Sequence, residues 1–223
     1  MTSPGLDAVL ARIRAAETAA GRPAGAVALL AASKQQTPAT LRATAAQGQR
    51  DYGENYVQEA LPKMAALVDL DLSWHFIGRI QRNKTRDIAA HFDWVHTVDR
   101  LDIAQRLSAQ RPASRAPLQT LIEVNVSGEA SKGGVAPAAV PALALAIGTL
   151  PGLRLRGLMS LPAPEDDPRR QRAAFAELRQ ALEALADPTL DTLSMGTSAD
   201  LEAAIAEGAT IVRVGTAIFG ARS

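Results

Sequence analysis

The residue best placed for chemistry is Lys34, which closely follows an uninterrupted apolar run over residues 26–32. Such a run predicts a strand that is buried on both faces, as in parallel sheets. In α/β folds, the residues that follow the carboxyl ends of these strands carry the chemistry. Because partial burial lowers the pKa of an amine, a lysine here is suited to forming a Schiff base with an aldehyde. The alternative is a lysine whose charged end simply reaches solvent.

Two turns that contain glycine, at Gly196 and Gly215, follow the last two predicted strands. Thr197 and Asp200 have the spacing of a capping box at the start of a helix predicted over residues 198–207. Glycine lets the backbone approach an anion closely, and free amides at a helix N-terminus bind phosphate. Barrels often bind phosphate after strands seven and eight, so the pair of turns favours a phosphate site over turns with no ligand.

Arg213 lies inside an apolar strand predicted over residues 210–214. A buried guanidinium must be paired, because an isolated buried charge is too costly. Two kinds of partner are open. One is a carboxylate such as Glu123 or Glu202, and the other is an acceptor atom on the ring of a bound ligand.

Eight predicted strands, each followed by a helix or a short tail, must position these residues. The fold class is therefore α/β, as a single-domain (β/α)8 TIM barrel over residues 1–223 with an extra N-terminal helix. An open doubly wound sheet is the rival fold, but the Gly-x-Gly-x-x-Gly turn after its first strand is missing. The strands are expected over residues 26–34, 51–56, 72–77, 94–98, 118–126, 153–159, 192–195 and 210–214. The helices are expected over residues 6–20, 38–46, 56–67, 100–109, 137–149, 168–186 and 198–207, and residues 78–90 are expected to form a turn and then a helix.

The residues that close the predicted strands form a mixed polar set, which suits a compact polar ligand. The set contains no carboxylate pair and no Ser/His/Asp grouping, so we assign no catalytic residue. The three histidines have no metal-ligand spacing and are interpreted as packed or surface imidazoles, so no metal site is predicted. The strand-end set consists of Lys34, Asn55, His75, Thr97, Asn125, Met159, Ser160, Ser194 and Arg213.

Bulk composition is that of an ordinary globular protein, with 47% hydrophobic and 21% charged residues. The net charge of +1 gives no electrostatic case for nucleic acid or an anionic membrane. The chain has no cysteine, and no apolar stretch approaches the roughly 20 residues of a membrane span. Its N-terminus lacks the order of a secretion signal, so we expect a cytoplasmic protein.

Taken together, these residues resemble the pyridoxal phosphate homeostasis proteins, the YggS/PROSC family. The resemblance extends almost from end to end of the chain, and the ordered set of motifs is specific where no single motif would be. The motifs are Ser33-Lys34, the run from Tyr52 to Glu59, Trp74 to Gly78 with Gln81, Asn83 and Lys84, Val124 to Ser127 with Lys132, Arg156 to Met159, Ser194 to Gly196, Ser198 with Asp200, and Arg213 to Arg222.

The resemblance implies the barrel of fold-type III enzymes such as alanine racemase, and pyridoxal 5'-phosphate (PLP) as cofactor. It implies a covalent Schiff base on Lys34 and an Arg213 that faces the pyridine nitrogen. It also implies that the phosphate is held by Ser198, Gly215 and Thr216, and that Asn55 lines the ring with Met159 and Ser160 nearby. Two residues depart from the family pattern, which usually has methionine at Thr197 and phenylalanine at Tyr52. Thr197 adds a hydroxyl beside the predicted phosphate site.

The family suggests a carrier and not an enzyme. We expect a non-catalytic monomer that binds PLP reversibly, contributes to vitamin B6 homeostasis and passes the cofactor to apo-enzymes. The alternatives are a fold-type III racemase or decarboxylase, and a phosphate-ester enzyme without cofactor. A racemase needs an acid or base beside the substrate, which its C-terminal β-domain helps to supply, and only nine residues follow Val214. Arg213 opposite the ring nitrogen would also weaken the electron sink.

Overall fold

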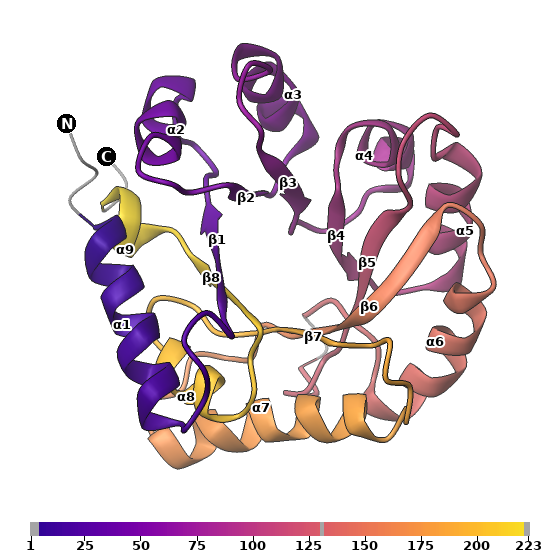
Figure 1. The fold of residues 1–223 in the computed structure, drawn as a ribbon. Helices are drawn as coiled ribbons and strands as arrows, with labels where there is room; N and C mark the ends of the chain where they lie inside the picture. Colours follow the sequence, from indigo (N-terminus) through magenta and orange to yellow (C-terminus); the bar gives the residue numbers. More distant parts are fainter. Residues whose placement is uncertain (1–4, 130–131, 221–223) are drawn as a thin grey trace.

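The computed structural model describes residues 5–129 and 132–220, and its eight strands close into one parallel barrel in chain order. Figure 1 shows the strands at the centre with the helices around them. The first strand pairs with the second and with the eighth, which closes the barrel and confirms the predicted fold. The strands are β1 (Ala28–Ala32), β2 (Asp51–Glu54), β3 (Ser73–Phe76), β4 (Trp94–Val98), β5 (Leu118–Glu123), β6 (Leu153–Met159), β7 (Thr192–Ser194) and β8 (Ile211–Val214).

The helices follow the predicted order with four differences. The turn predicted from residue 78 is followed by the 3-10 helix η1 before α4 begins at Thr85, and the helix predicted from residue 137 begins as the 3-10 helix η2 before α6. The helix predicted from residue 198 begins three residues later, as α8, and the tail after β8 contains a short helix, α9. The elements are α1 (Leu6–Ala19), α2 (Pro38–Ala45), α3 (Val57–Ala66), η1 (Arg82–Lys84), α4 (Thr85–His91), α5 (Leu101–Gln110), η2 (Pro137–Ala139), α6 (Val140–Gly148), α7 (Pro168–Glu183), α8 (Leu201–Ala206) and α9 (Thr216–Phe219).

The start of α2 shows how the local sequence determines where the helix after β1 begins. Thr37 is the N-cap, its hydroxyl accepts a hydrogen bond from the Thr40 amide at 3.2 Å, and Pro38 is the first helical residue. A threonine cap satisfies an otherwise unpaired amide, and proline is favoured where no intrahelical donor is needed. The chain therefore turns back along the barrel only a few residues after Lys34.

The main apolar core lies between the strands and the surrounding helices and includes Val9, Leu41, Ile88, Leu107 and Phe175. The barrel interior is different, because buried polar side chains meet there. His96 on β4 hydrogen-bonds to Ser194 on β7 at 2.9 Å, and since these strands are not neighbours, the bond crosses the interior. The apolar core between strands and helices thus stabilises the fold, whereas the interior of the barrel holds buried polar side chains.

A β-bulge interrupts β6. Thr120 on β5 is opposite Leu155, but the next residue, Leu121, is opposite Gly157, so Arg156 has no residue opposite it on β5. In a regular strand, residues three apart face opposite sides. Because of the extra residue, Leu155 and Leu158 both pack against the helix-covered core. The bulge therefore reverses which residues of β6 face the barrel interior.

Helix α1 fastens the beginning of the chain to its last helices and lies beside α8 and α9 (Figure 1). Arg12 forms an ion pair with Glu202 at 2.8 Å and donates a hydrogen bond to the carbonyl of Ser198 at 3.1 Å. A side-chain atom added at Gly5 would lie 1.9 Å from the Ala217 carbonyl oxygen, so α1 and α9 approach closely. The extra N-terminal helix therefore supports the loop between β7 and α8, which contains Ser198.

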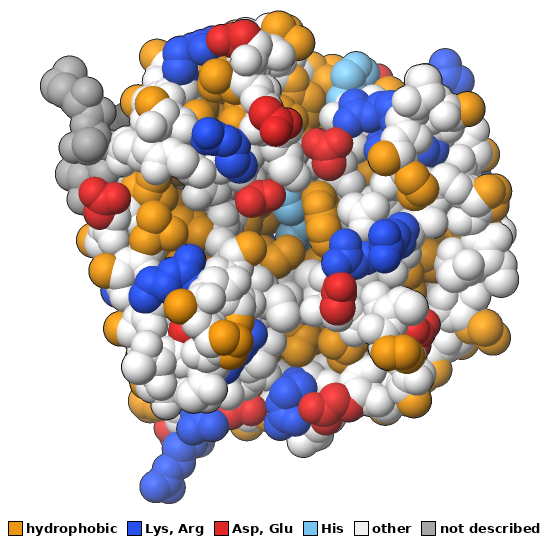
Figure 2. Space-filling view, viewed as in Figure 1, with side chains coloured by type: hydrophobic (Ala, Val, Ile, Leu, Met, Phe, Trp, Pro, Cys, Tyr) orange, Lys and Arg blue, Asp and Glu red, His pale blue; other side chains and the backbone are white. Residues whose placement is uncertain are grey.

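Charged side chains of both signs are interspersed on the face of the molecule in Figure 2. This distribution agrees with the small net charge of +1. Within residues 5–129 and 132–220, no helix has the length and apolar character needed to cross a membrane.

Candidate functional site

A cavity of about 310 Å³ lies where the carboxyl ends of the first and last strands meet. Its lining includes six of the predicted site residues, namely Lys34, Asn55, Ser198, Arg213, Gly215 and Thr216. The volume falls within the usual range for small-molecule sites. The lining also includes residues that the sequence reasoning did not assign to the site: Ala32, Gln36, Ile77, Leu161, Thr197, Ala199, Phe219 and Gly220.

Lys34 occupies a tight turn that follows β1. The amide of Gln36 donates to the Ser33 carbonyl at 3.0 Å, and Gln35 has a positive φ of 62°. A positive φ is uncommon for a residue other than glycine and marks a turn that the surroundings must hold. Here the Gln35 amide donates to the Glu59 carboxylate at 3.1 Å. The Lys34 amine has no hydrogen bond or ion pair with any residue that the structure describes, so it is available to a ligand.

A buried ionic cluster fixes the backbone immediately before Lys34. Glu54 accepts hydrogen bonds from the Ser33 hydroxyl at 2.6 Å and from the Lys63 amine at 2.7 Å. Lys63 also donates to the Ser33 carbonyl at 2.8 Å. Burial raises the pKa of Glu54, against the opposing effect of these two hydrogen bonds. Glu54 and Lys63 therefore hold Ser33, the residue before Lys34, in place.

The loop after β7 places Ser198 at the cavity without starting a helix there. The Asp200 carboxylate accepts hydrogen bonds from the Thr197 amide at 2.6 Å and from the Thr197 hydroxyl at 2.8 Å. This contact has the predicted pairing, but it holds residues 197–200 as a turn, and α8 begins only at Leu201. The prediction of a helix from Ser198 was therefore wrong, and Ser198 belongs to the loop that lines the cavity.

The chain after β8 also lines the cavity. Gly215 precedes α9, and Thr216, as its first residue, has an amide without an intrahelical acceptor. A side-chain atom added at Gly215 would lie only 3.0 Å from the Ala32 carbonyl oxygen. A side chain larger than that of glycine would therefore be crowded here, because the residue after β8 lies close to the end of β1.

Arg213 is buried at the inner end of the cavity. One terminal nitrogen donates to the Ser194 carbonyl at 2.7 Å and hydroxyl at 2.8 Å, and the other donates to the Ser160 carbonyl at 2.8 Å. Neither predicted carboxylate is its partner, because Glu202 pairs with Arg12 and Glu123 forms no ion pair within the described chain. Burial lowers the pKa of Arg213 to about 10, with Asp200 and Glu123 opposing that effect.

The structure separates the three remaining predicted residues, Asn55, Met159 and Ser160. Met159 and Ser160 are buried and do not line the cavity. Ser160 nevertheless holds Arg213 through its carbonyl, and its buried hydroxyl has no hydrogen-bond partner within the described residues. Asn55 does line the cavity, and a side-chain atom at Gly78 would lie 2.1 Å from its carbonyl oxygen. The backbone after β3 is thus pressed against the residue that closes β2.

The histidines lie away from the cavity lining. His75 and His96 are buried in the barrel, and His91 is exposed at the end of α4. In the part of the chain that the structure describes, no three histidine, aspartate or glutamate side chains are grouped as metal ligands would be. The site therefore combines an amine, a guanidinium, hydroxyls and backbone amides. This set suits a compact ligand that carries an aldehyde, an anionic group and a ring acceptor.

Comparison with known proteins shows which families and proteins this chain is similar to. Residues 5–223 match the family model of the alanine racemase N-terminal domain. The pyridoxal phosphate homeostasis protein of Pseudomonas aeruginosa is 63% identical over 214 residues, which are 96% of this chain and 93% of that protein. Its namesake from Escherichia coli K12 is 50% identical over 216 residues, or 95% and 92% of the two chains.

Solved structures have the same fold. PipY of Synechococcus elongatus PCC7942, solved with PLP bound, superposes with a TM-score of 0.82 at 38% identity and covers 95% of this chain and 100% of its own. Alanine racemase from Corynebacterium glutamicum superposes with a TM-score of 0.68 at 17% identity. That match covers 97% of this chain and 62% of the racemase, and at this identity it indicates a shared fold alone.

Proposed function

This chain belongs to the pyridoxal phosphate homeostasis proteins, and we propose that it binds PLP as a reversible Schiff base on Lys34, without catalytic turnover. The free amine of Lys34 in the 310 Å³ cavity is the observation that carries the proposal. An amine without a competing partner can condense with an aldehyde and release it again. The PLP-bound PipY structure, 38% identical over nearly the whole chain, supports the choice of ligand.

The other lining groups fit the rest of the molecule. We propose that the phosphate is held by Ser198, Gly215 and Thr216, which all line the cavity and offer hydroxyls and backbone amides. The third nitrogen of Arg213, Nε, has no acceptor among the described residues and is free to meet the ring nitrogen. Asn55 would line the ring, with Met159 and the unpartnered Ser160 hydroxyl close behind Arg213.

The absence of turnover is proposed from the chemistry of the lining. Among the described lining residues, the ionisable side chains are Lys34 and Arg213. PLP itself supplies electron withdrawal, but racemisation or decarboxylation also needs a protein group, in addition to the lysine that holds the cofactor, that moves a proton at the substrate. The cavity walls instead offer hydroxyl, amide and apolar groups, which bind and orient a ligand. The alternative of a fold-type III racemase or decarboxylase is kept as an outcome of the tests.

The first test is a spectrum of the purified protein with PLP, before and after reduction with borohydride. We expect a visible absorption band and, after reduction, the cofactor mass on the peptide that contains Lys34. Lys34→Ala should lose both. The matched control is Lys84→Ala in η1, which lies outside the cavity and should keep both. A cofactor mass on another peptide of the wild-type protein would show that Lys34 is misassigned.

A second test separates a carrier from an enzyme. The loaded protein should exchange the α-hydrogen of amino acids no faster than free PLP does, and it should restore the activity of an apo-enzyme mixed with it. Exchange well above the free-cofactor rate, abolished by Lys34→Ala, would indicate an enzyme. We also propose a cytoplasmic monomer, to be checked by cell fractionation and light scattering.

A further inference from the structure

A line of polar side chains crosses the barrel interior from the cavity to the opposite edge of the sheet. Arg213 contacts the Ser194 hydroxyl at 2.8 Å, and this hydroxyl contacts Nδ1 of His96 at 2.9 Å. Nε2 of His96 lies 2.9 Å from Nδ1 of His75, whose Nε2 lies 3.1 Å from the Asp51 carboxylate. Asp51 begins β2 at the N-terminal end of the barrel, so the line joins its two ends.

The chemistry of the two end groups favours one direction for the hydrogen bonds in this line. A guanidinium can only donate, so Ser194 accepts from Arg213 and its own hydrogen is left for His96. An ionised carboxylate can only accept, so His75 donates to Asp51 from Nε2. The bond between the imidazoles must then run from Nε2 of His96 to Nδ1 of His75. In this arrangement each imidazole carries one proton, on Nε2.

The opposite direction is disfavoured at both ends. If His96 donated to Ser194, the buried Ser194 hydrogen would have no acceptor, which costs free energy inside a protein. The lone pair of His75 Nε2 would also face the Asp51 carboxylate. The surroundings favour a neutral His96, because burial, with the charge of Arg213 acting in the same direction, holds its pKa well below the ordinary value.

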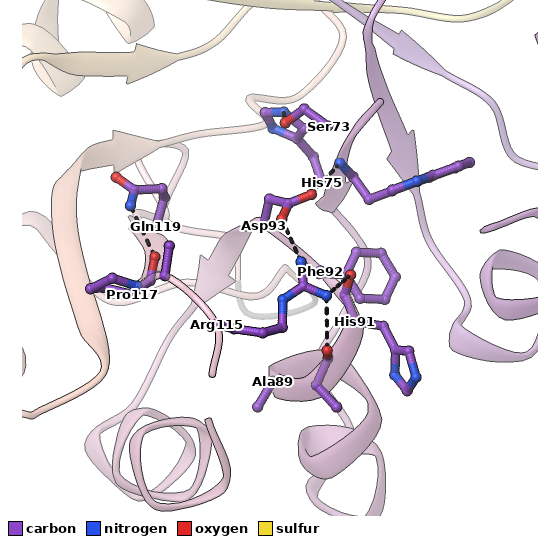
Figure 3. A network of polar contacts seen from close by, with 12 residues as sticks. Ser73, His75, Ala89, His91, Phe92, Asp93, Arg115, Pro117 and Gln119 are labelled. Carbon is purple, nitrogen blue, oxygen red and sulfur yellow. Dashed lines mark hydrogen bonds and ion pairs between the residues drawn. The ribbon is translucent and has the colours of Figure 1, made fainter. Parts of the chain in front are cut away.

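Packing leaves the rings little freedom to turn. The His75 ring stacks on Trp94 with centroids 5.4 Å apart and an interplanar angle of 3°, and it meets His96 edge-on at 5.1 Å. Ser73 lies against His75 at the N-terminal edge, as Figure 3 shows, with its hydroxyl 3.0 Å from Nε2. Figure 2 shows a histidine side chain near the centre of one face, beside an acidic side chain.

We propose that this hydrogen-bonded line orients Arg213 for the ligand ring, so that Ser194 and His96 are positioning residues for the cofactor site. Two of the acceptors of Arg213 are backbone carbonyls, and the third is the Ser194 hydroxyl. That hydroxyl can accept in a fixed direction only because His96 takes its hydrogen. The contact of Arg213 with the ring rests on the proposed function, whereas the direction of the line does not.

The direction is tested without any ligand by nitrogen NMR of the histidine side chains. The chain has only three histidines, and His75→Gln and His91→Gln complete the assignment. We expect both buried imidazoles to be neutral with the proton on Nε2. A proton on Nδ1 of His96, or a charged imidazolium at either buried position, would overturn the proposal.

The positioning role is tested with PLP and 1-deazapyridoxal 5'-phosphate, in which a carbon replaces the ring nitrogen. Wild-type protein should prefer PLP by about tenfold, a modest value for a charge-assisted hydrogen bond. Ser194→Ala should reduce this preference to about twofold, and Ser194→Thr, which keeps the hydroxyl, should restore it. Ser73→Ala is the matched control, because Asp51 still accepts from His75, and it should keep the wild-type preference.

The outcomes separate the two proposals. An unchanged preference in Ser194→Ala, or equal binding of both compounds by wild-type protein, would overturn the positioning role. Failure of wild-type protein to form the Schiff base with PLP would contradict the proposed function instead. The NMR result would then still decide the direction of the line.

Discussion

At the scale of single residues, the buried Lys63–Glu54 pair behind Lys34 differs from the ion pairs on the surface. The Glu54 side chain is fully buried and that of Lys63 is 7% exposed, whereas the side chains of Arg42 and Asp69 are about half exposed. A buried pair need not stabilise a protein more than apolar residues would, but loss of one partner leaves a charge without compensation. An exposed pair is screened by water and ions.

We therefore predict that Lys63→Met lowers the free energy of unfolding by about 3 kcal/mol, the lower end for a broken buried pair. Asp69→Asn, which breaks the exposed pair, should change it far less. Adding Glu54→Gln to Lys63→Met should recover part of the loss, because the amide carries no charge. Urea unfolding of the four proteins measures this. Equal effects of Lys63→Met and Asp69→Asn would show that the cluster does not support the lysine turn.

Glu123 gives the protein a pH-dependent stability. Its pKa is raised to about 7 by burial and then by the charge of Asp99, while Arg213 and Arg79 act in the opposite direction. Between pH 4.5 and about 7, the folded protein keeps a proton that the unfolded chain has released. Because the folded state binds more protons in this window, its stability falls as the pH rises.

From pH 5 to pH 8, the unfolding free energy of ligand-free wild-type protein should therefore fall by about 2 kcal/mol relative to Glu123→Gln, after allowance for solvent screening. Glutamine has nearly the same shape and does not titrate. Glu177→Gln, an exposed position on α7, is the control and should run parallel to wild type. Parallel curves for wild type and Glu123→Gln would contradict the prediction.

At the scale of elements, the bulge in β6 depends on Gly157. This residue has a φ of 150°, which side chains disfavour, and an added side-chain atom would lie 2.0 Å from the Thr192 carbonyl oxygen. The atom in the way belongs to the backbone of β7, so it cannot rotate aside. The bulge and its neighbour strand therefore require glycine at this position.

Gly157→Ala should lower the free energy of unfolding by about 3 kcal/mol or more, as expected for a strained and overpacked position. Gly148→Ala is the control, because nothing lies within 4 Å of the added atom, and alanine in a helix should be neutral or stabilising. Denaturant unfolding of both variants measures the difference. A Gly157→Ala variant as stable as wild type would mean that the bulge can relax.

The alternation of strands and helices could be predicted from the sequence because each buried parallel strand is a short apolar run between polar helices. The position of Lys34 and of the two glycine turns followed from that order. The bulge in β6 could not be predicted, since Arg156 and Gly157 also fit a regular strand. The short helix α9 has one turn, too little for a periodic pattern.

The hydrogen-bonded line through the barrel interior could not be predicted from the sequence for a different reason. His75 and His96 were treated as separate packed imidazoles, because 21 residues separate them and a further 98 separate His96 from Ser194. Only the closed barrel brings β3, β4 and β7 around one interior. The protein acceptors of Arg213 could not be predicted either, since backbone carbonyls of other strands leave no mark in the side-chain pattern.

At the scale of the whole molecule, ligand binding should stabilise the closed barrel, because the lining comes from both ends of the chain. PLP at 100 times its Kd should raise the free energy of unfolding by about 2.7 kcal/mol. Pyridoxal without phosphate, at the same concentration, should raise it by at least about 1.4 kcal/mol less, which corresponds to tenfold weaker binding. Ser198→Ala should reduce the difference in stabilisation between PLP and pyridoxal. Gly215→Val should abolish stabilisation by both compounds. Equal stabilisation of wild type by the two would contradict a phosphate site.

The pairing of β1 with β8 has a consequence for biosynthesis. Leu30, just before the lysine turn, is in register with Arg213, so the two halves of the cavity are made at opposite ends of translation. A ribosome that adds about 5–20 residues per second needs roughly 10–40 s to pass from one strand to the other. During that interval β1 has one open edge, which can pair with other chains. A fragment that lacks β8 therefore cannot form the cavity, because Arg213, Gly215 and Thr216 belong to its lining.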